Sequence, residues 1–218
     1  MKHLKLKCNP LDNLLGGGIE SGAITEVYGE AGSGKSNLCL QATRECANLG
    51  KKVAFIDSEG VSIERINQMC KKEYNFKKIL GDIIFFTPDS FDCQEKMIKE
   101  AIDNYDFELI VVDTLNLFYR MYLEDDKEAT MRSFLRQMGS MQMAARKKDI
   151  FILISEQVYT DKNGEIKPFT HRETEHMIKT SIKLEKIGIG KRNALIMKHR
   201  SQPEGKTASF TITSNGLE

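Results

Sequence analysis

The feature that most constrains the fold of this chain is an octapeptide near its start. Residues 29–36 read GEAGSGKS and match in full the pattern G-x-x-x-x-G-K-[ST], whose glycines let backbone N–H groups wrap a polyphosphate. An apolar stretch, residues 23–28, precedes the loop, and a helical pattern, residues 37–48, follows it. A strand, a phosphate loop and a helix in this order predict a nucleotide-binding α/β core, because the N-terminal end of the helix directs its positive dipole at the phosphates.

The loop predicts a site for ATP and Mg²⁺. Lys35 is expected to reach the β and γ oxygens, and the Ser36 hydroxyl to ligate the metal. Asp113 follows four apolar residues, 109–112, and a carboxylate at the end of a strand next to the loop strand would hold Mg²⁺ through water. The expected nucleotide contacts are Gly29, Glu30, Ala31, Gly32, Ser33, Gly34, Lys35, Ser36 and Asn37.

A hydrolase also needs a residue that orients or deprotonates the attacking water. Glu59 lies just past the apolar run 53–56, a strand that we expect beside the phosphate-loop strand. Ligands of open α/β sheets gather at the carboxyl ends of the strands, so Glu59 is our candidate general base. The alternative is a solvated loop acid.

Apolar runs alternate with amphipathic stretches through the first 155 residues, which is typical of a parallel sheet covered by helices. The predicted class is α/β, a mostly parallel twisted sheet flanked by helices with antiparallel strands at its C-terminal end, in a single domain over residues 1–218. Strands are expected at 23–28, 53–56, 83–86, 109–112 and 150–154, helices at 37–48, 63–74, 94–104 and 128–147, and antiparallel strands at 177–187, 194–197 and 207–212.

Charge and cysteine usage narrow the function classes. The chain has 32 basic and 31 acidic residues, a net charge of +1, so a nucleic-acid site must come from local clustering. Five cysteines with no C-x-x-C pair argue against a zinc ribbon or a disulfide framework. We see no secretory signal and no run of about 18 apolar residues, and therefore expect a cytoplasmic protein with no membrane contact.

The lead-in to the phosphate loop, residues 11–29, reads LDNLLGGGIESGAITEVYG and resembles that of RecA-type recombinases, most closely the archaeal RadA and eukaryotic branch. Residues 57–60 (DSEG), Glu64-Arg65, Asp113 and Gln157 keep the order and spacing of the family, and the resemblance extends over residues 11–217. It implies a RecA-type P-loop ATPase core.

The resemblance also implies roles for single residues. Glu59 matches the catalytic glutamate of the family, and Arg65 matches the arginine that stacks on adenine. Gln157 matches the glutamine that senses the γ-phosphate and opens the second DNA-binding loop. Tyr119-Arg120 begins the segment that corresponds to the first DNA-binding loop.

Three departures from full recombinases refine the resemblance. Only ten residues precede Leu11, where recombinases carry a helix–hairpin–helix domain, and no F-x-x-A polymerisation motif occurs. The second loop is not glycine-rich. A core-only chain of this kind resembles the RadB family of archaeal recombinase paralogues, which implies ATP binding, weak hydrolysis and DNA binding in recombination or repair, without strand exchange. The missing motif argues against long filaments, whereas a homodimer stays open.

Local clusters of basic residues are the candidates for DNA contact. Single-stranded DNA is favoured because aromatics such as Tyr159 and Phe169 lie among them, and double-stranded DNA stays open. Chance clustering on a charged surface is the alternative, and in the family the stretch 198–200 approaches a neighbouring subunit's nucleotide. Lys191-Arg192 forms a smaller cluster. The candidate DNA contacts are Arg120, Lys162, Lys167, Arg172, Lys198, His199 and Arg200.

The family implies the recombinase RadA as a protein partner, and a Holliday-junction resolvase as a further candidate. Two other functions stay open. One is an ATP-gated adaptor that does not hydrolyse its nucleotide. The other is a single-domain ATPase similar to the KaiC group, which shares the GGGI lead-in but usually has paired glutamates where this chain has Glu59 followed by Gly60. A small-molecule kinase is disfavoured, because no arginine-rich lid is visible.

Overall fold

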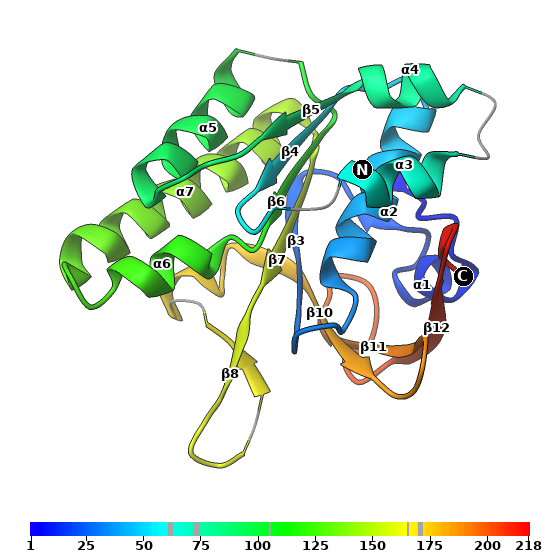
Figure 1. Cartoon of the computed structure of the whole chain (residues 1–218). Coiled ribbons are helices and arrows are strands. Elements are labelled where there is room, and N and C mark those ends of the chain that lie inside the picture. The colour runs from blue at the N-terminus through cyan, green and yellow to red at the C-terminus, as the bar shows by residue number, and fades with distance from the viewer. Residues whose placement is uncertain (61–62, 72–74, 105, 165, 170–171) are drawn as a thin grey trace.

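The computed structural model describes the chain except for residues 61–62, 72–74, 105, 165 and 170–171. Its centre is a nine-stranded sheet in the order β13-β12-β11-β10-β3-β7-β6-β4-β5. Helices cover both faces of the sheet, and a two-stranded ribbon projects from the body of the molecule (Figure 1).

Six parallel strands form the main part of the sheet. Three of the inner strands, β4, β6 and β7, are buried at every position because helices cover both of their faces. The β-branched and aromatic side chains of these strands suit a pleated, buried surface. The six strands are β3 (Ala23–Gly29), β4 (Val53–Asp57), β5 (Ile83–Phe86), β6 (Leu109–Asp113), β7 (Phe151–Glu156) and β10 (Ile178–Lys186).

The helices divide between the two faces, where two hydrophobic clusters form the core. Ser90 and Asp126 cap α5 and α7 by accepting hydrogen bonds from the backbone N–H groups of Cys93 and Ala129, which fixes where those helices begin. One face carries α5 (Phe91–Asp103), α6 (Asn116–Tyr122) and α7 (Lys127–Lys148), and the other α1 (Asn9–Leu14), α2 (Lys35–Asn48), α3 (Ile63–Cys70) and α4 (Phe76–Gly81).

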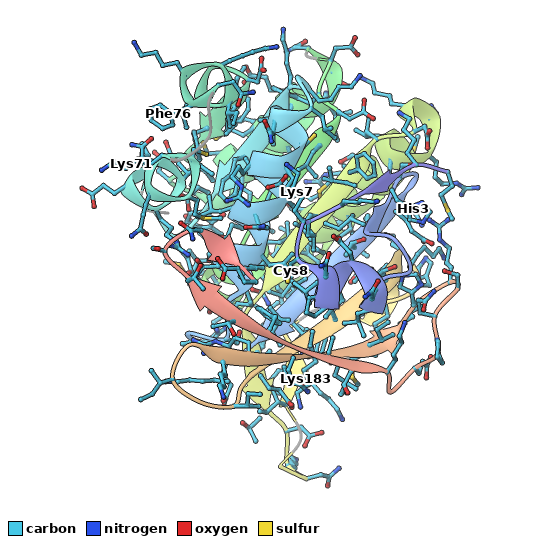
Figure 2. The ribbon with its side chains drawn as sticks, turned by 90° about the vertical axis from the view of Figure 1, so that its right-hand side faces the viewer. His3, Lys7, Cys8, Lys71, Phe76 and Lys183 are labelled. Atoms are coloured by element: carbon cyan, nitrogen blue, oxygen red, sulfur yellow. The ribbon has the colours of Figure 1, made fainter. Side chains whose placement is uncertain are left out.

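The two ends of the chain meet on α2. The buried amide of Gln41 donates to the Leu6 carbonyl at 2.7 Å and accepts from the Leu217 N–H at 3.3 Å. Figure 2 shows Cys8 at the start of α1, close to this junction. The strands near the two ends are β1 (His3–Leu4), β2 (Ile19–Glu20), β11 (Lys191–Lys198), β12 (Thr207–Thr213) and β13 (Gly216–Leu217).

The predicted fold class is confirmed, but two predictions about strand neighbours are wrong. The strands that end near Glu59 and Asp113 do not lie beside β3, because β7 inserts between β3 and β6, and β4 lies beyond β6. The strand predicted at 177–187 is β10, which runs parallel to β3 and antiparallel only to β11. Hydrophobic periodicity predicts a strand but not its neighbour, so crossovers in the chain path escape it.

Element boundaries differ from prediction mostly at helix ends. The predicted helix 63–74 is described as α3, Ile63–Cys70, and residues 72–74 lie outside the described part. Tyr119 and Arg120, expected to begin a loop, lie in α6. The turn-rich stretch after Glu156 forms the ribbon, β8 (Val158–Thr160) with β9 (Ile166–Pro168), followed by the short helix η1 (Arg172–Thr174).

All five cysteines are free, and four of them are buried. Across the part of the chain that the structure describes, none of the helices combines the length and apolar character that crossing a bilayer requires.

Glu26 is a buried acid of the sheet that lies outside the phosphate site. Glu26 on β3 is 3% exposed and pairs in register with Ser181 on β10, whose hydroxyl donates a hydrogen bond to its carboxylate. Burial raises the pKa of Glu26 to about 7, and the negative charge of Glu175 adds to this shift. The Ser181 hydrogen bond and the charge of Lys198 oppose it. Glu26 therefore binds its proton more tightly in the folded chain than in the unfolded one.

This shift predicts a pH-dependent loss of stability. Between pH 4.5 and 7 the folded chain holds a proton that the unfolded chain has released, so the stabilisation from Glu26 is complete below about pH 4.5 and is lost as the pH rises through about 7. Glu26→Gln is expected to remove up to roughly 3 kcal/mol of this decline. Urea unfolding at pH 5, 6, 7 and 8 measures it, with Glu185→Gln on the neighbouring strand β10 as control. Identical slopes for wild type and Glu26→Gln would contradict the prediction.

Candidate functional site

A cavity of about 610 Å³ lies at the carboxyl end of the parallel strands. Its walls come from five segments: the phosphate loop with the start of α2, the turn after β4, helix α6, the junction of β7 and β8, and the C-terminal strands. Parallel pairing brings these segments together, because their strands all end at the same edge of the sheet. The lining residues are Gly29, Ala31, Gly32, Gly34, Lys35, Ser36, Asn37, Glu59, Arg120, Gln157, Val158, Arg192 and Ile212.

The phosphate loop has the backbone that its glycines predict. Gly34 caps α2 with φ +107°, and a Cβ at this position would lie 3.0 Å from the Ile212 side chain. The Lys35 ammonium donates to the carbonyls of Gly29 at 2.9 Å and Glu30 at 3.2 Å. Burial lowers the pKa of Lys35, while the charges of Glu59 and Asp113 oppose the shift. A cation held over backbone carbonyls at the mouth of a helix N-terminus is suited to a polyphosphate.

Asp113 lies buried beneath Lys35 and Ser36 at the end of β6. The Ser155 hydroxyl donates to its Oδ1, while Oδ2 is buried with no hydrogen-bond partner among the described residues. Burial raises the pKa of Asp113, and Ser155 and Ser36 oppose the shift. An acceptor oxygen left unmatched beside a hydroxyl suits a hard cation, so Ser36 and Asp113 fit the predicted Mg²⁺.

Glu59 and Gln157, which are 98 residues apart in the chain, meet across the cavity. The Gln157 side-chain amide donates to the Glu59 carboxylate and accepts from the Arg120 guanidinium. The Asp57 carboxylate shapes the turn before Glu59 by accepting from the N–H groups of Glu59 at 3.2 Å and Gly60 at 2.8 Å. A hydrogen-bonded relay therefore runs from the turn after β4 to helix α6 through the side chains of Glu59, Gln157 and Arg120. The Gln157 amide is its centre.

Asn116 is a buried residue next to the cavity whose position the sequence did not reveal. Its buried side chain accepts from the Gln157 N–H at 3.0 Å and donates to the carbonyls of Gln157 at 3.0 Å and Phe169 at 3.1 Å. These bonds clamp both ends of the ribbon at its root. An asparagine three residues after the strand-ending Asp113 was the only signal in the sequence, and its partners are too distant in the chain to be inferred.

Arg192 has contacts that its grouping with Lys191 as a small basic cluster did not reveal. It lies at the start of β11, next to the hairpin turn, its side chain lines the cavity, and its Nε donates to the Gly32 carbonyl at 3.0 Å. The register explains this position, since Leu184 pairs with Gly29 and the hairpin after β10 extends over the phosphate loop. Arg192 thus adds a second cation to the loop.

The Rad51 family model matches residues 2–218. A DNA repair and recombination protein RadB from Methanococcoides burtonii is 46% identical over 221 residues, which are 99% of this chain and 97% of that protein. The chain belongs to the Rad51 family, in its archaeal RadB branch. The RadB protein of Thermoplasma volcanium is 37% identical and aligns with 95% of this chain and 88% of its own. A crystal structure of the RadB recombinase superposes with a TM-score of 0.87 at 35% identity, covering 99% of this chain and 98% of that one.

Members of the Rad51 family are P-loop NTPases that generally bind nucleotide with Mg²⁺, and the cavity of this RadB-type chain has the corresponding residues. Arg65, which the family resemblance assigns to adenine, donates from Nε to Asn37 Oδ1 at 2.8 Å and from Nη2 to the Thr213 carbonyl at 2.7 Å. It joins α3 to the start of α2 and to the end of β12. Arg65 therefore lies next to the cavity wall formed by Asn37, and its stacking on adenine stays a prediction.

The ribbon of this RadB-type chain carries two of the predicted DNA contacts. Lys162 is exposed at the tip, and Lys167 on β9 forms an ion pair with Asp161 at 2.6 Å. Arg172 begins η1, and its side chain lies outside the described part, as does His171. The ribbon root is held by Phe169, whose ring lies 5.2 Å from the Arg120 guanidinium carbon.

The predicted stretch 198–200 has three different surroundings. Lys198 donates to the Glu175 carbonyl at 2.8 Å. His199 is half-buried, burial lowers its pKa, and its Nδ1 accepts from the Ser201 N–H at 3.1 Å. Arg200 forms an ion pair at 2.9 Å with the buried carboxylate of Glu20, a pairing that anchors it to β2. Of the three, Lys198 has a side chain that lines a second cavity.

Asn116 gives a test of the ribbon clamp. Asn116→Ala removes the bonds to Gln157 and Phe169, including the acceptor of the Gln157 N–H and the donor to the Phe169 carbonyl, so we expect a loss of about 1–3 kcal/mol of unfolding free energy. Amide hydrogen exchange in the ribbon is expected to accelerate more than in the sheet. Asn104→Ala at the exposed end of α5 is the matched control. Unchanged ribbon exchange in Asn116→Ala would show that the clamp does not hold the ribbon.

Proposed function

We propose that this chain is an ATP-binding and DNA-binding accessory protein of homologous recombination and DNA repair, with weak, DNA-modulated ATP hydrolysis and no strand exchange. The observation that carries the proposal is the direct connection between the nucleotide cavity and the ribbon through Gln157, whose side chain bonds Glu59 and whose backbone is clamped by Asn116. The names of the RadB relatives support a role in DNA repair and recombination.

The nucleotide half of the proposal rests on the phosphate loop. Backbone N–H groups of residues 29–36, Lys35 and Arg192 would bind the phosphates of ATP, and Arg65 would contact adenine. Ser36 and Asp113 would hold Mg²⁺, Asp113 through water, and the ion when bound neutralises charge on the phosphate oxygens. Glu59 is the general base that would orient and deprotonate the attacking water.

The DNA half rests on a change of partner at Gln157. In the structure its amide is shared between Glu59 and Arg120, so a γ-phosphate that draws the amide away would release both. Once released, Glu59 could accept a proton from water. Release of Arg120 would alter its cation–π contact with the Phe169 ring at the ribbon root. Nucleotide state would thereby select the ribbon conformation that meets DNA, through differential contacts in the two states.

Two alternative functions, a KaiC-type ATPase and a non-hydrolysing adaptor, are not equally supported. Membership of the Rad51 family favours the recombinase branch over an ATPase of the KaiC type. A non-hydrolysing adaptor remains an alternative, because the same relay can transmit occupancy without turnover. Single-stranded DNA, the recombinase RadA, a junction-resolving nuclease and a second copy of the chain belong to the proposal as partners, and the cytoplasm as its location.

Joint binding measurements test both halves. A fluorescent ATP analogue and a fluorescent single-stranded oligonucleotide are titrated at low salt, alone and together. Lys35→Ala is expected to lower the affinity for the ATP analogue by about 100-fold, because a charge-assisted contact with the phosphates is lost. The same variant is expected to abolish the effect of nucleotide on DNA binding. Lys51→Ala, an exposed lysine after α2, is the control. Equal nucleotide affinity in wild type and Lys35→Ala would reject the nucleotide site, and absence of DNA binding with or without ATP would reject the DNA function.

Turnover separates the enzyme from the adaptor. Glu59→Gln keeps the hydrogen bond to Gln157 but cannot accept a proton, so hydrolysis is expected to fall by about 100-fold or more while nucleotide affinity changes less than about threefold. Released phosphate is the measurement, with Glu100→Gln on α5 as a control of the same chemistry. Equal, near-zero rates in wild type and Glu59→Gln would identify the adaptor.

A further inference from the structure

A second cavity, of about 430 Å³, lies at the root of the ribbon, apart from the nucleotide site. The residues that line it come from β3, β8, β9, the segment after η1, β10 and β11, and none of them lines the nucleotide cavity. In Figure 2 the ribbon, which follows β7, projects below the C-terminal strands and the labelled Lys183 of β10. The volume is within the range of about 300–1,000 Å³ that is typical of small-ligand sites.

The cavity wall contains the buried pair of Glu26 and Ser181. Oε2 of Glu26 accepts from the Ser181 hydroxyl, whereas Oε1 is buried and has no hydrogen-bond partner within the described residues. A buried carboxyl oxygen without a donor carries an unrecovered desolvation cost. A ligand that supplies an N–H donor would lower that cost, which points to a polar ring edge rather than to an anion.

The rim of the cavity carries an aromatic ring and two cations from distant parts of the chain. Tyr159 on β8 is 43% exposed, and its ring meets that of Phe169 edge to face at 5.7 Å. Lys167 on β9 and Lys198 on β11 line the same cavity. The fold thus places two predicted DNA contacts, separated by 30 residues of sequence, around one exposed aromatic ring.

We propose that this cavity binds one nucleotide of single-stranded DNA, with its base against Tyr159, the polar edge of the base at Glu26 and Ser181, and the flanking phosphates at Lys167 and Lys198. The inference rests on the proposed DNA-binding function and gives it a location separate from the nucleotide cavity. Stacking of a base on an aromatic side chain contributes about 1–3 kcal/mol and suits single strands, whose bases are free to turn outward.

The charge around Glu26 makes the site sensitive to pH. The groups that face Glu26 are Glu175 after η1, Lys198 on β11 and Lys167 on β9. Ionisation of Glu26 as the pH rises through about 7 adds a negative charge near the DNA phosphates. DNA affinity is therefore expected to fall from pH 6 to pH 8, and by less in Glu26→Gln.

Tyr159 variants test the base contact directly. Fluorescence anisotropy at low salt measures binding of an oligo-dT and of the same length with abasic sites, and a single 2-aminopurine reports stacking. Tyr159→Leu is expected to lower the affinity for oligo-dT by about 10-fold and to remove the 2-aminopurine quenching. Tyr159→Phe keeps the ring, so its affinity is expected to stay within about twofold of that of the wild type. Since Tyr159 is exposed, folding should be unaffected, and binding of the ATP analogue serves as the check.

The outcomes distinguish this site from the proposed function. Wild type that binds oligo-dT at least about 10-fold more tightly than the abasic strand, with the difference lost in Tyr159→Leu, supports the nucleotide site. Equal binding of both strands, or equal affinity in Tyr159→Leu and Tyr159→Phe, overturns it while DNA binding itself stands. No DNA binding by wild type overturns both proposals. The phosphate contact is tested by comparing the oligo-dT affinity of Lys198→Ala with that of Lys186→Ala, a control lysine at the end of β10. Only Lys198→Ala is expected to weaken binding.

Discussion

The arrangement of functional residues depends on the parallel register of the inner strands. Tyr28 pairs with Glu156, Val112 with Ile154, and Asp57 with Asp113, so β3, β7, β6 and β4 all end at one level. A slip of a strand by one residue would turn its buried side chains to the opposite face. The same register that buries both cores therefore also fixes the phosphate loop, the buried acid and the turn before Glu59 relative to one another.

The site combines rigid and exchangeable hydrogen bonds. Asn116, Ser155 and Asp57 bond to backbone groups or to buried atoms, and these contacts fix the geometry of the loops. The contacts of Gln157 with Glu59 and Arg120 join exposed side chains, whose bonds exchange readily with water or ligand. The second group of bonds can therefore change partners without disturbing the first.

The sequence predicted the parts of the site that obey local rules. The phosphate loop, Asp113 and the strand before Glu59 follow from spacing and apolar runs over a few residues, and in the structure Glu59 and Asp113 both lie close enough to Lys35 to influence its charge. Arg192 and Asn116 could not be placed in this way, because their roles depend on which strands become neighbours and on a hairpin that extends over a loop. Periodicity also predicted β10 as a strand, but the antiparallel direction expected for it was wrong at β3, since hydrophobic periodicity does not reveal the crossover that makes the two strands parallel.

The junction on Gln41 has a consequence for handling the protein. One side-chain amide joins the Leu6 carbonyl and the Leu217 N–H to the helix that begins at Lys35, so segments from both ends of the sequence are held against the phosphate-binding helix. Trimming residues 216–218 would leave Gln41 Oε1 buried without its donor. An affinity tag placed directly after Glu218 would pull on the hydrogen bond between Leu217 and Gln41. A flexible spacer between Glu218 and the tag would leave this bond and α2 undisturbed.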